Sequence, residues 1–176
     1  MKPRALLSLV AAAALLVGCA APAAPGAMTP PAATVPAPHQ FPYTVSVATR
    51  GGAATDPMLS TNVSDADLRA AVESAIRDSR VFREVVSEGA DYRLSVTVVQ
   101  LTKPFVGFDF TVTMETGWTL VRAQDQQVLL RKVVSGTHTA TMSESFIGAK
   151  RLELAVEGAA RRNIEQGISA LAALDL

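Results

Sequence analysis

The chain has 176 residues, of which 49% are hydrophobic and 18% are charged, and its formal net charge is zero. This length allows one domain, or two at most, and the hydrophobic fraction excludes a wholly disordered chain. Zero net charge disfavours a nucleic-acid-binding protein, because such a protein needs a basic face to meet phosphates. A single cysteine and two histidines, His39 and His138, exclude an internal disulfide and disfavour a metal site.

The N-terminal segment has the pattern of a secretory signal peptide. Lys2 and Arg4 form a short positive region, and an uncharged, almost wholly apolar run of 13 residues follows from Ala5 to Val17. This run is too short to cross a hydrocarbon core of ~30 Å, which needs about 20 residues, but it fits the apolar region of a signal peptide. We therefore predict that residues 1–18 are a signal peptide that is removed.

The end of this run carries a second signal. Leu16, Val17, Gly18 and Cys19 resemble the lipobox of bacterial lipoproteins. The resemblance implies that the sulfur of Cys19 receives a diacylglycerol group, that this cysteine becomes the new N-terminus, and that its amino group is then acylated, for example by palmitate. Two or more such chains hold a protein on a membrane essentially permanently. No other cofactor is expected. The alternative is an ordinary signal peptide that is cut elsewhere.

The residue after Cys19 bears on the destination of the protein, because it is Ala20 rather than aspartate. In lipoproteins of bacteria with two membranes, aspartate at this position retains the protein in the inner membrane. The resemblance therefore implies the inner leaflet of the outer membrane, with the protein facing the periplasm. Removal of Lys2 and Arg4 leaves 14 basic and 16 acidic residues, and the formal charge of −2 again disfavours nucleic acid as a partner.

Residues 19–40 are predicted to be the lipidated cysteine and a Pro/Ala-rich tether. Ala20 to Gln40 contains eight alanines, six prolines and no charged residue. Prolines favour extended polyproline II structure, so we expect no helix or strand to persist in this segment. The tether is expected to enter the domain at the end opposite to the apolar loops described below. Binding to a proline-recognising partner is the alternative to a spacer.

Residues 41–176 are predicted to form one periplasmic domain. Tyr43 to Val47 alternate apolar and polar residues, which is typical of a half-buried strand. Ser64 and Asp67 have the spacing of a capping box. Apolar residues at helical spacing then predict a helix from about Asp65 to Ser79.

Three strands and a second helix follow in the sequence. A strand begins at Tyr92 and contains a bulge near Val99, where the apolar phase shifts. The clearest alternation of the chain runs from Phe108 to Leu120, interrupted at one position, and predicts the next strand. Val128 to Thr141 are rich in β-branched residues and return as the fourth strand. Ala149 to Leu174 are predicted to form a long helix.

This order of strand, helix, three strands and helix predicts a two-layer α+β domain. Its sheet is four-stranded and mostly antiparallel, with two helices on one face. The first strand is expected to lie parallel to the second through a right-handed crossover. On the outside of the last helix, Arg161 is spaced to pair with Glu157 and Glu165. Asn163 lies near the apolar side of this helix and is expected to be buried with a hydrogen bond to a loop or the sheet.

No catalytic constellation is visible in the sequence, and we expect no enzymatic activity. A serine or cysteine nucleophile needs a histidine base, but Cys19 is assigned to lipidation and His138 lies between two threonines of a strand. The sequence has neither a Gly-x-Ser-x-Gly elbow nor a glycine-rich phosphate loop. Asp109 and Glu115 are separated by roughly 20 Å of strand, which is too far for a glycosidase carboxylate pair.

One end of the predicted sheet gathers apolar loop residues. Because antiparallel strands reverse direction, the loop after the second strand and the loop after the fourth lie at the same end, and the loop with Met58 joins them if the first two strands are parallel. We predict a docking patch for a protein or an acyl chain at this end. Its candidate residues are Phe105, Val106, Phe108, Phe146 and Ile147. The alternative is that these side chains fold back and seal the core under the helix N-termini.

A family resemblance rests on three segments, which are Asp67-Leu68-Arg69, Ala90-Asp91-Tyr92-Arg93-Leu94 and Glu157-Gly158-Ala159-Ala160-Arg161-Arg162-Asn163-Ile164. With the lipobox, the tether and the element order, they resemble the YajG-type bacterial outer-membrane lipoproteins over most of residues 41–174. The layout is also similar to auxiliary lipoproteins of ABC-type lipid transport and of lipopolysaccharide assembly. The resemblance supplies no catalytic residues. It implies a non-catalytic binding or structural module of the cell envelope, or else an accessory protein of lipid or lipopolysaccharide transport, with an envelope protein or a lipid as partner.

Overall fold

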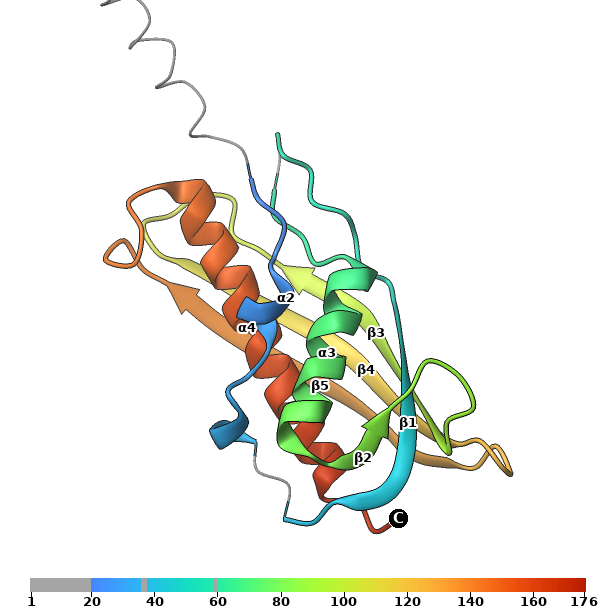
Figure 1. Cartoon of the computed structure of the whole chain (residues 1–176). Coiled ribbons are helices and arrows are strands. Elements are labelled where there is room, and N and C mark those ends of the chain that lie inside the picture. Colours follow the sequence, from blue (N-terminus) through green and yellow to red (C-terminus); the bar gives the residue numbers. More distant parts are fainter. Residues whose placement is uncertain (1–19, 36–37, 59) are drawn as a thin grey trace, which may run out of the picture.

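Within residues 20–35, 38–58 and 60–176, which the computed structural model describes, a five-stranded sheet carries two long helices on one face (Figure 1). The predicted signal peptide and lipobox lie outside the described residues. The strands are β1 (Phe41–Arg50), β2 (Phe82–Val85), β3 (Tyr92–Thr102), β4 (Phe110–Arg122) and β5 (Val128–Ala140). The helices are α2 (Pro25–Met28), a 3-10 turn η2 (Ala32–Thr34), α3 (Asp65–Ser79) and α4 (Gly148–Ala172). None of the helices in this described part is long and apolar enough to cross a membrane.

The strands lie in the order β2-β1-β3-β4-β5. β1 is parallel to both β2 and β3, whereas the pairs β3–β4 and β4–β5 are antiparallel. The predicted parallel pairing of β1 with the strand that begins at Tyr92 is therefore confirmed. The predicted bulge is confirmed as well, because the β3–β4 register shifts between Val98 and Gln100.

The α+β class is confirmed, but the prediction of four strands is wrong, because β2 adds a fifth strand at the edge of the sheet. The prediction of a mostly antiparallel sheet is wrong as well, because two of the four strand pairs are parallel. β2 has four residues, and its two middle side chains, Arg83 and Glu84, are exposed. Such a segment is too short to show the alternation that identifies a strand. Charged side chains on a short edge strand also discourage pairing with another chain.

The capping box predicts the start of α3 correctly. The hydroxyl of Ser64 accepts a hydrogen bond of 3.1 Å from the backbone N–H of Asp67. The helix ends at Arg80, whose φ of 56° is the left-handed conformation common at helix C-termini. The buried face consists of Leu68, Ala71, Val72, Ala75 and Ile76, with Ser79 in its last turn.

The core lies between the sheet and the two long helices. The inward-facing side chains of β4 alternate as predicted, and Trp118 is fully buried among them. Gly167 of α4 faces the Trp118 indole so closely that a Cβ at this position would overlap the ring. The missing side chain of Gly167 is therefore what allows α4 to pack against β4 at this point. The fully buried aliphatic residues of α4 are Val156, Ile164, Ile168 and Leu171.

Asn163 of α4 is buried, as the sequence predicts, and its amide group joins two strands. Its side-chain NH₂ donates to the backbone carbonyl oxygens of Met114 and Val134, each at 2.9 Å. Its carbonyl oxygen accepts a hydrogen bond of 2.6 Å from the Thr116 hydroxyl, which in turn accepts one of 2.8 Å from the Trp118 indole N–H. Thr116 therefore interrupts the apolar alternation of β4 because it completes a buried polar network.

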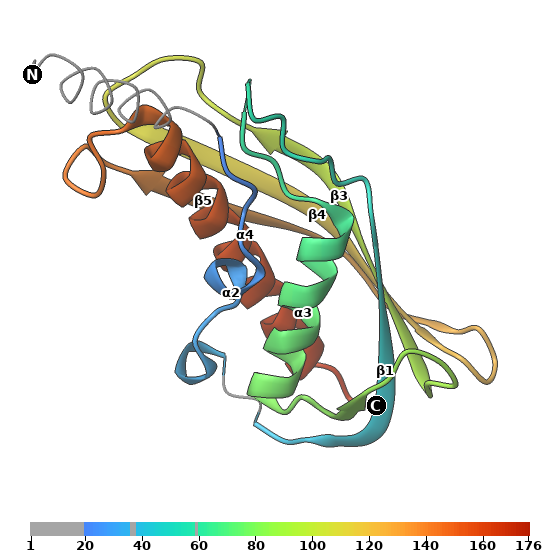
Figure 2. The same ribbon diagram turned by 45° about the horizontal axis from the view of Figure 1, so that its top comes forward.

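Residues 20–35, which we call the strap, do not behave as a free tether. The expectation that no helix persists in this segment is wrong, because α2 forms one turn and Ala23, Met28 and Val35 are buried. In Figures 1 and 2 the strap runs along the helical layer, with α2 lying between α3 and α4. The apolar strap residues bury surface against the helices, and this burial favours the packed state over an extended spacer.

Two charged residues of α4 hold the strap. A carboxylate oxygen of Glu157 accepts a hydrogen bond of 2.9 Å from the Ala24 backbone N–H, and the Arg161 Nε donates one of 2.9 Å to the Ala27 carbonyl oxygen. The predicted pairing of Arg161 with Glu157 and Glu165 on the outside of the helix is therefore wrong. Glu165 pairs instead with Arg162, at 2.9 Å. The strap covers the face that helical periodicity assigns to solvent.

Candidate functional site

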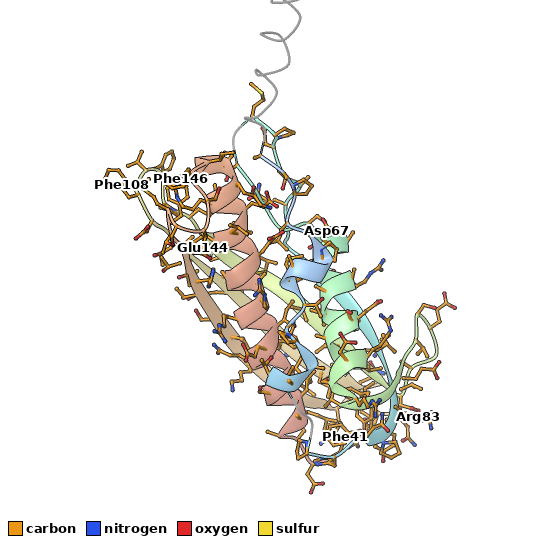
Figure 3. The ribbon with its side chains drawn as sticks, turned by 60° about the vertical axis from the view of Figure 1, so that its left-hand side comes forward. Phe41, Asp67, Arg83, Phe108, Glu144 and Phe146 are labelled. Carbon is orange, nitrogen blue, oxygen red and sulfur yellow. The ribbon has the colours of Figure 1, made fainter. Side chains whose placement is uncertain are left out.

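The topology brings three loops to one end of the sheet, as the sequence predicts. β1 ends and α3 begins at this end, and so do the turn from β3 to β4 and the connection from β5 to α4. Figure 3 shows Phe108 and Phe146 at this end, whereas Phe41 and Arg83 lie at the opposite end. The β3–β4 loop, the β5–α4 loop and the loop between β1 and α3 therefore lie at the same end of the sheet.

Large apolar side chains project from all three loops. Phe105 is fully exposed, and Phe108 and Phe146 keep 80% and 82% of their surface accessible. We call this set of residues the apolar tip, and its members are Met58, Phe105, Val106, Phe108, Phe146 and Ile147. The sequence left open whether these side chains seal the core, and the structure places them in solvent. A cluster of exposed aromatic side chains at one end is the pattern of an interaction surface.

A different aromatic residue closes the core beneath the tip. Phe110, the first residue of β4, is partly buried, and the guanidinium group of Arg151 lies 4.7 Å from the centre of its ring. Arg151 is itself buried, and its Nη1 donates a hydrogen bond of 2.7 Å to the Ser145 carbonyl oxygen. Because Phe110 and Arg151 fill this end of the core, the tip residues are not needed there.

The acidic residues of the tip loops are turned back toward their own backbone. Glu144 accepts a hydrogen bond of 2.7 Å from the Thr141 N–H, and this bond lowers the pKa of the Glu144 carboxyl below its usual value. Asp109 accepts one of 3.2 Å from the Met142 N–H, and Asp56 accepts one of 2.9 Å from the Met58 N–H. These carboxylates shape the loops, and all three residues remain exposed beside the apolar side chains.

A groove of about 630 Å³ lies beside the tip. Its walls are Ser60, Leu101, Lys103, Pro104, Phe105, Phe110, Gly148, Ala149 and Leu152. The Lys103 ammonium group donates to the Ser60 hydroxyl, the Thr61 carbonyl and the Asn62 side-chain oxygen at 2.8, 2.9 and 2.6 Å. Burial lowers the pKa of Lys103. With three acceptors engaged, Lys103 joins the β1–α3 loop to the end of β3, a role that no spacing in the sequence indicates.

The start of the strap is fixed at the same end. The Ala20 backbone N–H donates a hydrogen bond of 3.0 Å to the Pro57 carbonyl, and the Thr61 hydroxyl donates one of 2.9 Å to the Ala21 carbonyl. The segment that follows the predicted lipobox is therefore held first at the tip end of the body. From there the strap runs along the helical layer (Figure 1), and the chain enters β1 at Phe41, at the far end of the sheet (Figure 3), which is the end at which the sequence predicts that the tether enters the domain.

Neither histidine belongs to the apolar tip. His39 is exposed, and its ring meets that of Phe41 edge-on at 4.7 Å between centroids. His138 is half-buried, and its ring packs against Gly158 of α4. Among the residues that the structure describes, no three His, Cys, Asp or Glu side chains are grouped so that they could hold a metal ion.

Comparison with known proteins finds similar folds and no similar sequence family. No family model matches the chain, and no curated protein sequence matches it significantly. A crystal structure of a Xanthomonas campestris protein of the DUF330 family is 19% identical, covers 78% of this chain and 87% of its own, and has a TM-score of 0.53. A hypothetical protein of Chlamydia trachomatis is 6% identical, covers 76% and 98%, and has a TM-score of 0.56.

A third solved structure, described as a putative lipoprotein from Caulobacter crescentus, is 17% identical, covers 60% of this chain and 77% of its own, and has a TM-score of 0.46. The first two likenesses span most of both chains, and at these identities they show a shared fold. The chain therefore has an α+β fold that also occurs in a DUF330 protein and in a chlamydial protein.

Proposed function

We propose that this protein is a YajG-type lipoprotein, anchored through acyl chains on Cys19 in the inner leaflet of the outer membrane and facing the periplasm. In this role it acts as a non-catalytic binding or structural module of the cell envelope. One observation carries the proposal: the packed body begins directly after the lipobox, because Ala20 is already hydrogen bonded to Pro57. An anchor at Cys19 would therefore hold the body itself at the membrane surface rather than a distant domain on a spacer.

The anchor is tested by the mass of the full-length protein after expression in a bacterium with two membranes. We expect a chain that begins at Cys19 and carries a diacylglycerol and an N-acyl group. The Cys19→Ser variant is expected to retain the signal peptide or to lose the acyl chains. An unmodified Cys19 in the mature protein contradicts the proposal.

The destination is tested by membrane fractionation. Wild-type protein is expected in the outer-membrane fraction, and the Ala20→Asp variant is expected to move to the inner-membrane fraction, because aspartate after the lipidated cysteine is the retention signal implied by the lipobox resemblance. Ala20→Ser is the matched control, since it introduces a polar side chain without a charge. Equal distribution of the wild-type and Ala20→Asp proteins contradicts the proposed sorting.

The proposed binding role is tested by crosslinking in cells. A photoreactive residue at Phe108, which lies in the apolar tip, is compared with one at Gln124, an exposed position in the hairpin between β4 and β5 at the other end of the sheet. Reproducible crosslinks to a component of one envelope complex from Phe108 and not from Gln124 support a binding module. Crosslinks to the same proteins from both positions contradict a specific surface.

A second candidate function is an accessory role in lipid or lipopolysaccharide transport, and the groove beside the tip favours it. A volume of about 630 Å³ is within the usual range for small-molecule sites, and Leu101, Phe110 and Leu152 give it apolar walls. Mass spectrometry of lipids that copurify with the full chain tests this role. Leu152→Trp is expected to displace such a lipid, and Met58→Ser, outside the groove, is the control. Equal lipid occupancy in Leu152→Trp contradicts this candidate.

A further inference from the structure

Two features that are far apart in the sequence meet at one end of the fold. The strap begins there, with Ala20 bound to Pro57 and the Ala23 N–H donating a hydrogen bond of 3.5 Å to the Asn62 carbonyl. One member of the apolar tip, Met58, follows Pro57 directly in this loop, and the tip phenylalanines project from the two other loops at the same end of the sheet. Successive Cα atoms are only ~3.8 Å apart, so the residue that precedes Ala20 in the chain is covalently held at this end.

We propose that the apolar tip inserts into the bilayer that holds the acyl chains of Cys19, so that the sheet stands with this end against the membrane. The inference rests on the proposed lipid anchor and adds a second, non-covalent membrane contact to it. Phe105, Phe108 and Phe146 supply the inserted side chains. Phenylalanine is one of the side chains that interfacial segments bury at the boundary between headgroups and acyl chains.

The polar groups of the tip are compatible with this contact. The carboxylates of Asp56, Asp109 and Glu144 are exposed, but each accepts a hydrogen bond from a backbone N–H group of the tip loops, which supplies part of their solvation at a membrane surface. The Lys103 ammonium group has three neutral acceptors within 2.9 Å. The ammonium group of Lys103 is therefore engaged within the protein, and insertion is expected to depend mainly on the apolar area that the tip phenylalanines bury in the bilayer.

The bilayer is a better occupant for this surface than a protein, because of where the chain enters the body. While the strap is packed, an anchor adjoining Ala20 keeps this end of the body near the membrane, which gives the bilayer a high effective concentration relative to a free partner. The exposed phenylalanines at this end of the body then have the membrane as an apolar environment to enter. A second copy of the chain and a separate envelope protein are the other occupants that the experiment must distinguish.

The experiment uses the full-length protein, expressed in a bacterium and reconstituted into vesicles of phosphatidylethanolamine and phosphatidylglycerol. Cys19 is the only cysteine of the chain, and acylation blocks its thiol, so an introduced cysteine can carry a single nitroxide label. The label is placed at residue 106 by Val106→Cys, which keeps all three tip phenylalanines. Gln124→Cys, at the opposite end, is the matched control. Accessibility to oxygen and to a water-soluble nickel complex is measured at both sites.

The label at residue 106 is expected to be accessible to oxygen and protected from the nickel complex by at least about fivefold relative to the label at residue 124. Equal accessibility to the nickel complex at both sites overturns the proposal. Dipolar broadening between labels at residue 106 would show a second copy at the tip and overturns it as well. A label at residue 106 that is protected from the nickel complex but is not more accessible to oxygen would be covered by protein rather than by acyl chains. This result also contradicts insertion.

A double substitution tests whether the phenylalanines cause the insertion. In Val106→Cys carrying Phe105→Ser and Phe146→Ser, the label is expected to become accessible to the nickel complex, while the acylated protein stays in the vesicle fraction. The thermal unfolding midpoint is expected to stay unchanged, because both side chains are exposed. The mass of the purified protein separates the two proposals, because it shows whether Cys19 is acylated. An unacylated chain contradicts the anchor. An acylated chain whose label at residue 106 is exposed to water contradicts only the insertion.

Discussion

The Glu157 carboxylate of α4 accepts a hydrogen bond of 2.9 Å from the backbone N–H of Ala24, although the two residues are 133 positions apart. One turn later in α4, Arg161 binds the carbonyl of Ala27. The strap has no charged side chain of its own, so it offers only backbone groups to these two residues. Glu157 and Arg161 therefore fix a segment whose composition is that of a linker.

Glu157→Ala is expected to destabilise the fold by about 1–3 kcal/mol, because the Ala24 N–H loses its acceptor in a partly buried place. It should also open residues 20–35 to thermolysin before the body unfolds. Urea unfolding and limited proteolysis measure the two effects. Glu165→Ala removes a carboxylate of the same helix that pairs on the surface with Arg162, and we expect it to cost below about 1 kcal/mol. Equal effects of the two substitutions would show that the strap is not held through Glu157.

Asn163→Ala is expected to cost about 2–4 kcal/mol, because it leaves the carbonyl groups of Met114 and Val134 and the Thr116 hydroxyl without their buried partner. Chemical denaturation measures the loss. Arg162→Ala, the neighbouring position on the exposed side of α4, is the control and should lie within about 1 kcal/mol of wild type. An Asn163→Ala protein as stable as wild type would mean that water replaces the amide.

Gly167→Ala is expected to destabilise the protein by about 1–3 kcal/mol, although alanine is the better helix former, because its Cβ would overlap the Trp118 indole. Trp118 is the only tryptophan, so its fluorescence reports the disturbance directly. Gly117→Ala adds the same methyl group where no heavy atom lies within 4 Å. If the tryptophan fluorescence spectrum of Gly167→Ala is the same as that of the wild type, the close packing of α4 on β4 is contradicted.

Acid should weaken the junction between β1 and β3. The carboxylate of Asp91 accepts hydrogen bonds from the backbone N–H and from the hydroxyl of Thr44. The bond from the N–H has the larger effect, and together the two bonds hold the pKa of Asp91 below its ordinary value of 3.8. The stabilisation is therefore present above pH 3.8 and is lost as the pH falls through the lower pKa of the folded protein.

We expect Asp91→Asn to flatten this acid dependence, as measured by thermal unfolding at a series of pH values from neutral to strongly acidic. Thr44→Val keeps the backbone N–H and removes the hydroxyl, so it should flatten the dependence only in part. If the unfolding midpoint of Asp91→Asn falls with acid as steeply as that of the wild type, the acid sensitivity belongs to other carboxyl groups.

Local signals in the sequence predict much of this fold. The capping box of Ser64 and Asp67 sets the start of α3, and the alternation of β4 sets its inward face, because both depend on residues close together in the chain. The strap was not predictable in this way. Its burial depends on Glu157 and Arg161, far along the chain, and alanine and proline show no periodicity that would reveal it.

The exposure of the apolar tip was also not predictable from local patterns in the sequence. Aromatic residues at the ends of strands can either close a core or face solvent, and the spacing of Phe105 and Phe146 fits both arrangements. Contacts between Phe110 and Arg151 decide the outcome, since these two residues close the end of the core. The order of residues alone does not reveal which phenylalanine does this.

The strap also determines how the protein responds to a pull on its N-terminus. Force applied at Ala20 loads the hydrogen bond to Pro57 first, then the bond of Ala21 to Thr61, and next those of Ala24 and Ala27 to α4. Bonds that are loaded one after another yield at a lower force than bonds that share the load. The segment would peel away like a zipper and lengthen the reach of the body from its attachment point, while the sheet and both long helices stay folded.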